Sequence, residues 1–124
     1  MSQDIISDAL NKIMNAKRSG KKEVVVNRHS ILLLKIMEMA KKEGYIESYK
    51  TEKNNLEIKI GDISNCGAVK PRFNVKKDKI LFYMKRFLPA RNLGILIIST
   101  NQGLITHVDA IDKNIGGSLI AYFY

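Results

Sequence analysis

The spacing of apolar residues changes along this chain, and this change constrains the fold more than any other feature. Between residues 4 and 17, Ile6, Leu10 and Ile13 recur at the spacing of one helical face, which predicts an amphipathic helix. Residues 56–60 instead alternate between apolar and charged side chains, as in a strand with one buried face. A chain that switches between these two periods is predicted to have an α/β (α+β) fold.

The amino-terminal half is predicted to form a helix, a strand, a second helix and a hairpin. Three consecutive valines within residues 23–27 indicate the short strand. Ser30 can cap the second helix through its side-chain oxygen, and Gly44 follows the end of that helix. Asn54 and Asn55 tolerate a positive φ, so they are predicted to form the hairpin turn.

The carboxyl-terminal half is predicted to be a second small lobe that is mainly β with short helices. Glycines at both ends of the segment 61–67 indicate a hinge, so the lobes are predicted to span residues 1–61 and 62–124. Pro71 restricts the segment that follows to an edge strand or a bend. The remaining predictions are a helix at 78–88 stopped by Pro89, a strand at 94–99, a turn at Gly103, a strand at 104–106, a helix at 107–113 and a strand at 118–124.

Basic residues outnumber acidic ones, and this excess favours a polyanionic partner, most commonly a nucleic acid. Twenty-one Lys and Arg residues against twelve Asp and Glu residues give a formal net charge of +9. The charges gather in two places. The first holds Lys12, Lys17, Arg18, Lys21, Lys22 and Arg28 around Glu23, and the second lies between Lys70 and Arg91 around Asp78. A solvated surface with no partner would have more interspersed acids, so at least one concentration is predicted to face RNA.

The sequence predicts neither a membrane-spanning segment nor a secretory signal. The longest apolar runs fall far short of the ~20 residues that cross a bilayer. The amino terminus is polar and lacks a secretory signal, which predicts a cytoplasmic protein. Cys66 is the single cysteine, so it can form neither an internal disulfide nor a multi-cysteine zinc site, and it is predicted to be a small buried hydrophobe.

Residues 94–110 form the most specific motif. A glycine and an apolar strand lead to Ser99 and Thr100, and two variable residues, Gly103, two apolar residues and Ala110 follow. This order resembles the signature of the ribosomal protein S-eight family. Further stretches are similar to its archaeal and eukaryotic branch, and together they cover essentially the whole chain: Ser7-Asp8-Ala9-Leu10, Asn15-Ala16 with Arg18, Gly44-Tyr45-Ile46, Asn65-Cys66-Gly67, Pro71-Arg72-Phe73, Leu88-Pro89 and Gly116-Gly117.

The resemblance implies a structural constituent of the small ribosomal subunit in the cytoplasm. Members of this family are primary rRNA-binding proteins that bind a helix in the central domain of small-subunit ribosomal RNA and support assembly of the platform. Neighbouring small-subunit ribosomal proteins are then further partners, and the chain is expected to be monomeric there. Several members also bind their own mRNA and repress it, so an off-ribosome regulator of messenger translation is the alternative.

Thirteen residues are predicted to bind RNA. They are Ser99, Thr100, Asn101, Gln102, Gly103, Gly116 and Gly117 in the carboxyl-terminal lobe, and Asn15, Lys17, Arg18, Lys21, Lys22 and Arg28 in the other. Short hydroxyl and amide side chains on a tight turn suit the shallow minor groove of A-form RNA, whose deep major groove excludes side chains. The lysines and arginines would hold neighbouring phosphates by charge.

Several of these residues also have a purely structural interpretation. The hydroxyls of Ser99 and Thr100 could satisfy only the backbone of their own turn. Gly116 and Gly117 could permit a tight bend or bring the main chain against a ribose. Tyr122 could stack on a base or pack in the core, and strand aromatics are more often in the core.

The chain departs from the family pattern at two positions. Relatives usually carry a basic residue, proline, any residue, serine and lysine before the second helix, whereas residues 27–31 here read Asn-Arg-His-Ser-Ile. The lysine contact expected from the family is therefore missing. The residue after Ala110 is often basic in relatives and is Ile111 here. The candidates to compensate are Arg28, Lys113 and the surplus of other lysines.

No catalytic residue, metal or cofactor is predicted, and the chain is not expected to be an enzyme. His107 and Asp109 are two positions apart, which on a helix points them roughly 200° from each other and prevents an acid-base pair. His29 and His107 lack the spacing of metal ligands. A glycine-rich phosphate loop of the nucleotide-binding kinds is also missing from the sequence.

Overall fold

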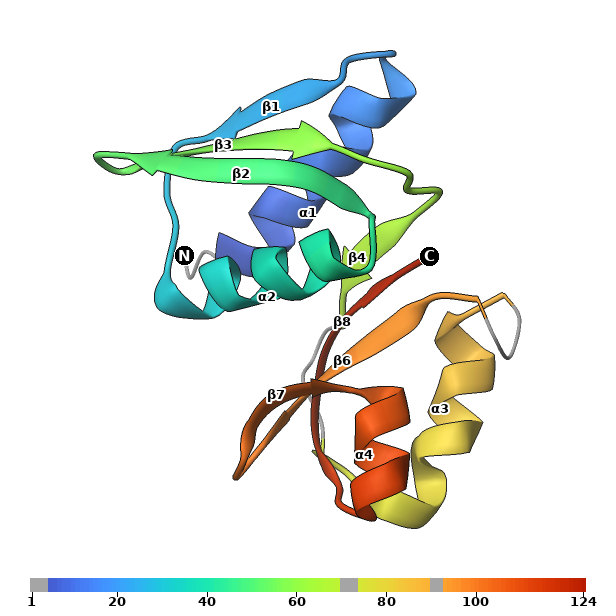
Figure 1. The fold of residues 1–124 in the computed structure, drawn as a ribbon. Coiled ribbons are helices and arrows are strands. Elements are labelled where there is room, and N and C mark those ends of the chain that lie inside the picture. The colour runs from blue at the N-terminus through green and yellow to red at the C-terminus, as the bar shows by residue number, and fades with distance from the viewer. Residues whose placement is uncertain (1–4, 70–73, 90–92) are drawn as a thin grey trace. The chain divides into compact units, whose positions relative to one another are not determined.

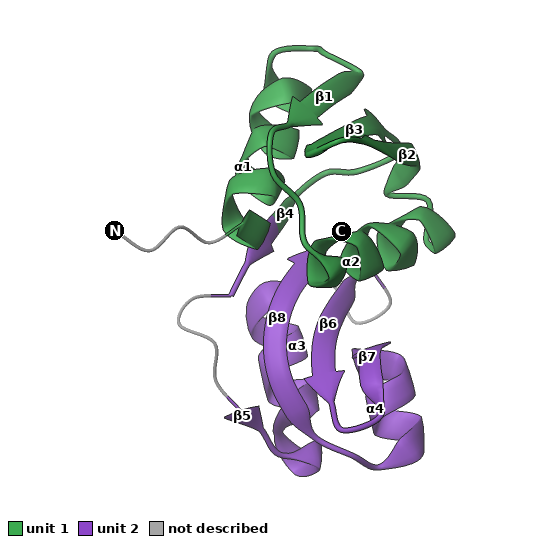
Figure 2. Ribbon diagram, turned by 90° about the vertical axis from the view of Figure 1, so that its left-hand side faces the viewer, with its two compact units in different colours: residues 1–66 green, residues 67–124 purple. Residues whose placement is uncertain are grey.

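The computed structural model describes residues 5–69, 74–89 and 93–124 (Figure 1). Helices and two antiparallel sheets make up most of this part of the chain, which confirms the predicted α/β (α+β) fold with two lobes. The chain divides into two compact units, unit 1 at residues 1–66 and unit 2 at residues 67–124 (Figure 2). This division lies a few residues beyond the boundary predicted between Gly61 and Asp62.

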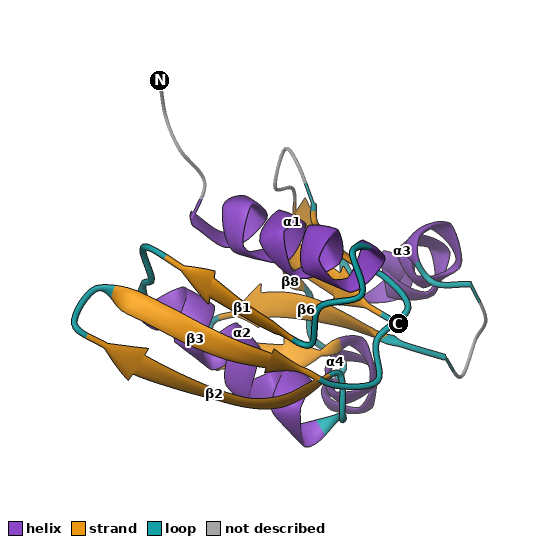
Figure 3. Cartoon of the chain, turned by 90° about the horizontal axis from the view of Figure 1, so that it is seen from above, coloured by secondary structure: helices purple, strands orange, loops and turns teal. Residues whose placement is uncertain are grey.

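Unit 1 places two helices on one face of a three-stranded sheet (Figure 3). Its elements are α1 (Ile5–Arg18), β1 (Glu23–Val26), α2 (Ile31–Lys42), β2 (Ile46–Glu52) and β3 (Asn55–Ile60), with the strand order β1-β3-β2. Ile6, Leu10 and Ile13 of α1 are buried, as their helical spacing predicts. Leu56 and Ile58 of β3 are buried as well, so the alternating pattern of this strand is also confirmed.

The two ends of α2 follow the predicted capping chemistry. Leu33 N donates a hydrogen bond of 3.2 Å to Ser30 Oγ, which satisfies one of the free amides at the start of the helix. Gly44 follows the last turn with φ +85°, a conformation in which a side chain would be strained. Both capping predictions are therefore confirmed.

The predicted position of the hairpin turn is wrong by one residue. Glu52 pairs with Asn55, so the turn consists of Lys53 and Asn54 rather than the two asparagines. Lys53 has φ +56° and takes the left-handed conformation that was expected of an asparagine. The register of β2 against β3 decided the position, because Leu56 and Ile58 must face the helices.

Unit 2 is a mainly β unit covered by short helices. Its elements are β4 (Cys66–Ala68), β5 (Asn74–Val75), the 3-10 helix η1 (Lys77–Lys79), α3 (Ile80–Phe87), β6 (Ile95–Thr100), β7 (Gly103–Thr106), α4 (His107–Lys113) and β8 (Gly117–Phe123). The strand order is β4-β8-β6-β7, and β5 also pairs with β8. Leu96, Ile98 and Leu119 of the sheet share a core with Met84 of α3 and Ala110 of α4. Pro71, predicted to limit an edge strand, lies outside the described residues.

The helices of unit 2 begin and end where local chemistry requires. The predicted helix at 78–88 is a 3-10 turn followed by α3, and Leu88 is already extended, because a residue before proline disfavours the helical conformation. Thr106 Oγ1 caps α4 by accepting a hydrogen bond of 3.3 Å from Asp109 N. Asn114 ends α4 with φ +59°.

Candidate nucleic-acid interface

The turn between β6 and β7 presents the polar residues of the most specific motif. Thr100 pairs with Gly103, so Asn101 and Gln102 form a two-residue turn, and both of their side chains are exposed. Thr100 Oγ1 donates to Gly103 O at 2.9 Å and accepts from Gln102 N at 3.0 Å. Gly103 has φ +103°, which confirms its conformational role.

The two hydroxyls of this motif therefore differ. Thr100 uses its hydroxyl proton and one acceptor site within the turn, as the structural interpretation predicts. Within the described residues the half-buried Ser99 hydroxyl makes no hydrogen bond to the protein. Ser99 thus keeps its donor and its acceptor for another molecule, and Thr100 holds the turn on which Ser99 lies.

A polar row across the sheet extends this surface and was missed from the sequence. Ser118 of β8 lies opposite Ser99 of β6, and Asn74 of β5 lies opposite Ser118. Side chains of directly opposed residues in antiparallel strands point to the same face, so the three lie side by side. Ser118 Oγ donates to Asn74 Oδ1 at 3.1 Å. The row depends on strand register, which no local pattern in the sequence specifies.

Gly116 and Gly117 lie where the backbone approaches other main chain too closely for any side chain. A Cβ atom on Gly117 would overlap Ser99 O and would lie 2.9 Å from Thr100 Cγ2. A Cβ atom on Gly116 would overlap Val75 O. Both glycines are therefore required for the packing of β8 beside β6 and β5, which is the first of their two predicted roles. Their predicted contact with ribose remains a proposal.

His107 supports the strand that leads to the turn. Its side chain is 2% exposed, and its Nδ1 accepts a hydrogen bond of 3.1 Å from Leu96 N. Thr106 is the last β7 residue that pairs with β6, so the imidazole continues the hydrogen bonding of β6 where β7 ends. Burial lowers the pKa of His107, which keeps the ring neutral and Nδ1 free to accept.

In unit 1, three of the predicted lysines line one hollow. Lys17, Lys21 and Lys22 line a hollow of about 490 Å³ at the carboxyl end of α1. Gly20, with φ +79°, lets the chain turn back there after the helix. The hollow also holds two carboxylates, those of Glu47 and Asp62, which the sequence did not associate with the lysines.

Arg28, Arg18 and Asn15 do not line this hollow. Arg28 lines a separate hollow of about 260 Å³ together with Lys12 and Asp8. Arg18 is exposed, and its charge acts on Cys66, partly offsetting the burial that raises the pKa of that thiol to about 12. The side chain of Asn15 is exposed on α1. The structure thus separates the predicted charge cluster into distinct parts of unit 1.

Two further predictions are decided by burial. Cys66 is 5% exposed, and its thiol donates a hydrogen bond of 3.7 Å to Leu10 O, which confirms the buried, structural role. The Tyr122 ring stacks between the rings of Phe87 and Tyr124, with centroids 5.7 Å and 6.2 Å away, and packs against the core of unit 2. The structure therefore favours the core interpretation of Tyr122.

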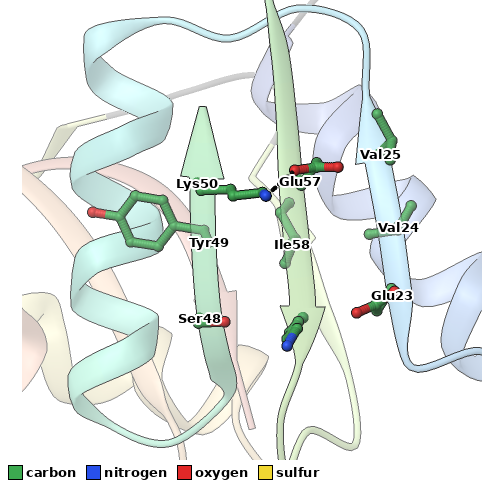
Figure 4. Close-up of a pocket in the computed structure, with 9 residues that line it drawn as sticks. Glu23, Val24, Val25, Ser48, Tyr49, Lys50, Glu57 and Ile58 are labelled. Carbon is green, nitrogen blue, oxygen red and sulfur yellow. Dashed lines mark ion pairs between the residues drawn. The ribbon is translucent and has the colours of Figure 1, made fainter. Parts of the chain in front are cut away.

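The outer face of the unit 1 sheet carries a hollow of about 420 Å³ that contains none of the predicted RNA-binding residues (Figure 4). Charges of both signs alternate there. Lys50 Nζ lies 3.2 Å from Glu57 Oε2, and Glu23 pairs across strands with Lys59. Because its acids and bases balance, this face is a weaker candidate for a polyanion than the hollow lined by Lys17, Lys21 and Lys22.

Comparison with known proteins decides the family. The family model described as "Ribosomal protein S8" matches residues 4–124. The chain belongs to the ribosomal protein S8 family. Proteins named "Small ribosomal subunit protein uS8" are similar to it over the full length of both chains, with 40% identity in Nanoarchaeum equitans and 36% in Picrophilus torridus. The protein "Small ribosomal subunit protein uS8A" of Schizosaccharomyces pombe is 33% identical over 98% of both chains.

Membership of this family agrees with the resemblance drawn from residues 94–110 and from the archaeal and eukaryotic motifs. The family is one of structural ribosomal proteins, which confirms that the chain is not an enzyme. Within the described ranges, no helix is both long enough and apolar enough to cross a membrane. Nor do the described residues include a group of three or more histidine, cysteine, aspartate or glutamate side chains placed to hold a metal ion.

Proposed function

We propose that this member of the S8 family is a primary rRNA-binding constituent of the small ribosomal subunit. Its RNA target is an irregular helix in the central domain of small-subunit ribosomal RNA, and its binding supports assembly of the platform. Neighbouring small-subunit proteins are its other partners in the cytoplasm, and it acts there as a monomer. The observation that carries this proposal is the Ser99 hydroxyl, unpaired among the described residues, beside a turn held by Thr100.

The turn provides the specific part of the interaction. Ser99 can both donate and accept, and the exposed amides of Asn101 and Gln102 carry two donors and an acceptor each. The bonds that Thr100 makes within the turn hold these groups in one geometry, which lowers the entropy lost on binding. Short groups fixed in this way fit the minor groove, where ribose hydroxyls and base edges are accessible. Gly117 allows β8 to lie close beside this end of β6, and Gly116 allows the chain before β8 to lie close to Val75 of β5.

The lysines of unit 1 provide the part of the affinity that does not depend on sequence. Lys17, Lys21 and Lys22 share one hollow, and their charges can release counterions from neighbouring phosphates. Glu47 and Asp62 in the same hollow repel a phosphate, so they limit where the backbone of the RNA can pass. Arg28, Arg18 and Asn15 act at separate points of unit 1. Arg28 also offers a cation near the position where relatives carry a lysine.

Competition binding tests the proposal. Ser99→Ala removes a hydroxyl that makes no internal bond, so the variant should fold normally and should bind a central-domain rRNA fragment about 2- to 12-fold more weakly. Binding to a scrambled hairpin of equal length should not change. Ser48→Ala, which removes a hydroxyl from the outer face of the unit 1 sheet, is the matched control and should leave both affinities as they are.

Equal losses on the cognate and the scrambled RNA would contradict the role of Ser99. Equal affinity of the native protein for both RNAs would contradict rRNA recognition itself. Tighter binding to the protein's own messenger than to the rRNA fragment, at the same salt concentration, would favour the off-ribosome regulator instead.

A further inference from the structure

The outer face of α3, formed by Leu81, Phe82, Lys85 and Arg86, has no role in the contacts described above. Ile80 and Met84 turn the opposite side of this helix into the core of unit 2. Leu81 and Phe82 are left 46% and 60% exposed, and among the described residues Phe82 carries the one aromatic ring in the set of exposed large apolar side chains. An exposed ring beside a second apolar side chain offers a flat apolar surface on which a partner can pack.

Positive charge surrounds this ring. Lys76, Lys77, Lys79, Lys85 and Arg86 are all exposed, and Asp78 is the one acidic residue between positions 74 and 89. None of these cations forms an ion pair among the described residues. Lys85 and Arg86 follow Phe82 by three and four positions, which places them on the same side of the helix as the ring. The charges are therefore free to meet a polyanion beside Phe82.

The ring of Tyr83 supports Phe82 from one side. Its ring lies edge-to-face with that of Tyr83, at 5.2 Å between centroids and 90° between planes, and Tyr83 packs against the core. One turn further on, the guanidinium of Arg86 lies 5.9 Å from the centroid of the Phe87 ring. A ring braced in this way loses little freedom when a flat group stacks on it.

We propose that the outer face of α3 binds an unpaired RNA nucleotide, with the base stacked on Phe82 and the adjacent phosphates held by Lys85 and Arg86. Exposed aromatic rings between cations are the usual means by which proteins hold single-stranded RNA. The inference rests on the proposed function only in taking RNA as the partner. It uses residues separate from the β6–β7 turn and a different kind of RNA, single-stranded rather than helical.

A protein partner fits this face less well. The apolar area of Leu81 and Phe82 is small and is interrupted by Lys85 and Arg86, whereas the centre of a protein interface is depleted of charge. Substitutions at position 82 distinguish an RNA partner from a protein partner, because stacking on a base requires an aromatic ring and an apolar protein contact does not.

The test uses the full-length protein and a short fluorescent single-stranded oligoadenylate, with a paired hairpin of equal length as the second probe. Phe82→Leu keeps an apolar side chain and removes the ring, so affinity for oligoadenylate should fall roughly 5- to 150-fold. Phe82→Tyr keeps the ring and should bind nearly as well as the native protein. Val108→Ala, which shortens an exposed apolar side chain on α4 and lies outside the outer face of α3, is the matched control and should have little effect.

Each outcome decides the proposal. Selective loss with Phe82→Leu, and its absence with Phe82→Tyr and Val108→Ala, supports stacking. Equal affinity of Phe82→Leu and the native protein for oligoadenylate overturns it, and an apolar protein contact is then the better explanation of the exposed ring. Binding of the central-domain rRNA fragment, measured in parallel with Ser99→Ala, shows whether the proposed function fails too or only this inference. Equal melting temperatures of all variants show that the fold is unchanged.

Discussion

Gly117 has no space for a side chain, because β8 lies so close to β6 that a Cβ atom at this position would overlap Ser99 O. The atoms that a Cβ would meet are backbone and branched methyl groups, which cannot move away freely. Single residues of this kind set the geometry of the candidate interface through packing within the protein. His107 is the second example, since its neutral ring completes the hydrogen bonding of Leu96.

We predict that Gly117→Ala destabilises the protein. The new methyl group overlaps Ser99 O and lies 2.9 Å from methyl carbons of Ile98 and Thr100, so the free energy of unfolding should fall by about 1–3 kcal/mol. Chemical denaturation measures this change. Gly20→Asn is the control, because Gly20 has open space around it and asparagine tolerates its φ of +79°. An unchanged denaturation midpoint for Gly117→Ala would contradict the close packing of β8.

Stability should also decrease in mild acid because of His107. Above pH 6.5 the imidazole is neutral in both the folded and the unfolded chain, and its contribution to stability is complete. Below pH 6.5 the His107 side chain becomes protonated in the unfolded chain. It stays neutral in the folded protein, because burial lowers its pKa there. The free energy of unfolding then falls by up to about 1.4 kcal/mol per pH unit until the folded-state pKa is reached.

His107→Asn tests the origin of this pH dependence. Asparagine offers an oxygen near the position of Nδ1 but does not titrate, so the variant should show a flatter stability profile below pH 6.5. Denaturation curves of the native protein and the variant at several pH values measure the difference. The same slope in both proteins would show that another group is responsible.

At the level of elements, the β6–β7 hairpin combines two functions in adjacent residues. Thr100 shapes the turn through two hydrogen bonds, whereas the Ser99 hydroxyl has no partner among the described residues and can bind another molecule. A mutation at Thr100 should therefore affect stability as well as binding, whereas a mutation at Ser99 should affect binding alone. The hairpin is exposed at its tip, so the effects on stability should stay modest.

We predict that Thr100→Val loosens this hairpin. Valine keeps the branched shape and the strand preference of threonine but loses both hydrogen bonds, so the free energy of unfolding should fall by about 1 kcal/mol. Hydrogen exchange at the Gln102 amide, which donates to the Thr100 hydroxyl, should become faster. Thr100→Ser retains the hydroxyl and is the control. Unchanged exchange at Gln102 in Thr100→Val would mean that the turn does not depend on this side chain.

At the level of the whole molecule, the proposed function draws on residues of both units. The turn that carries Ser99 belongs to unit 2, and the hollow with Lys17, Lys21 and Lys22 belongs to unit 1. With a formal net charge of +9, the protein should bind RNA with a strong salt dependence. The salt dependence and the sequence preference should therefore respond to different mutations.

Removing a lysine of the unit 1 hollow should weaken binding to all RNAs alike. For Lys21→Gln, the slope of log affinity against log salt concentration should become shallower by roughly one unit, because one phosphate contact is lost. Titrations of cognate and scrambled RNA over a range of salt concentrations measure this slope. Lys50→Gln removes an equal charge from the outer face of the sheet, where Lys50 is paired with Glu57, and should leave the slope unchanged.

The sequence by itself determined most of the elements, their order and the family, but not β4, which begins inside the segment predicted as a hinge. Helix and strand periods, the Ser30 cap and the stop at Pro89 are set by neighbours in the chain, so local patterns were sufficient to predict them. The motif around Ser99 and Thr100 is likewise continuous in sequence. One local prediction failed at Lys53, because the register of the hairpin outweighed the turn preference of Asn55.

Only the tertiary structure decided which side chains meet. It placed Asn74 and Ser118 in one row with Ser99. It also paired the Leu96 amide with the His107 ring. Arg28 lies in a different hollow from the one lined by Lys17, Lys21 and Lys22. These contacts join residues far apart in the chain, and they depend on strand register and on packing against a shared core. A single sequence carries no direct signal of such distances, because the same local pattern is compatible with several registers and several arrangements of the helices.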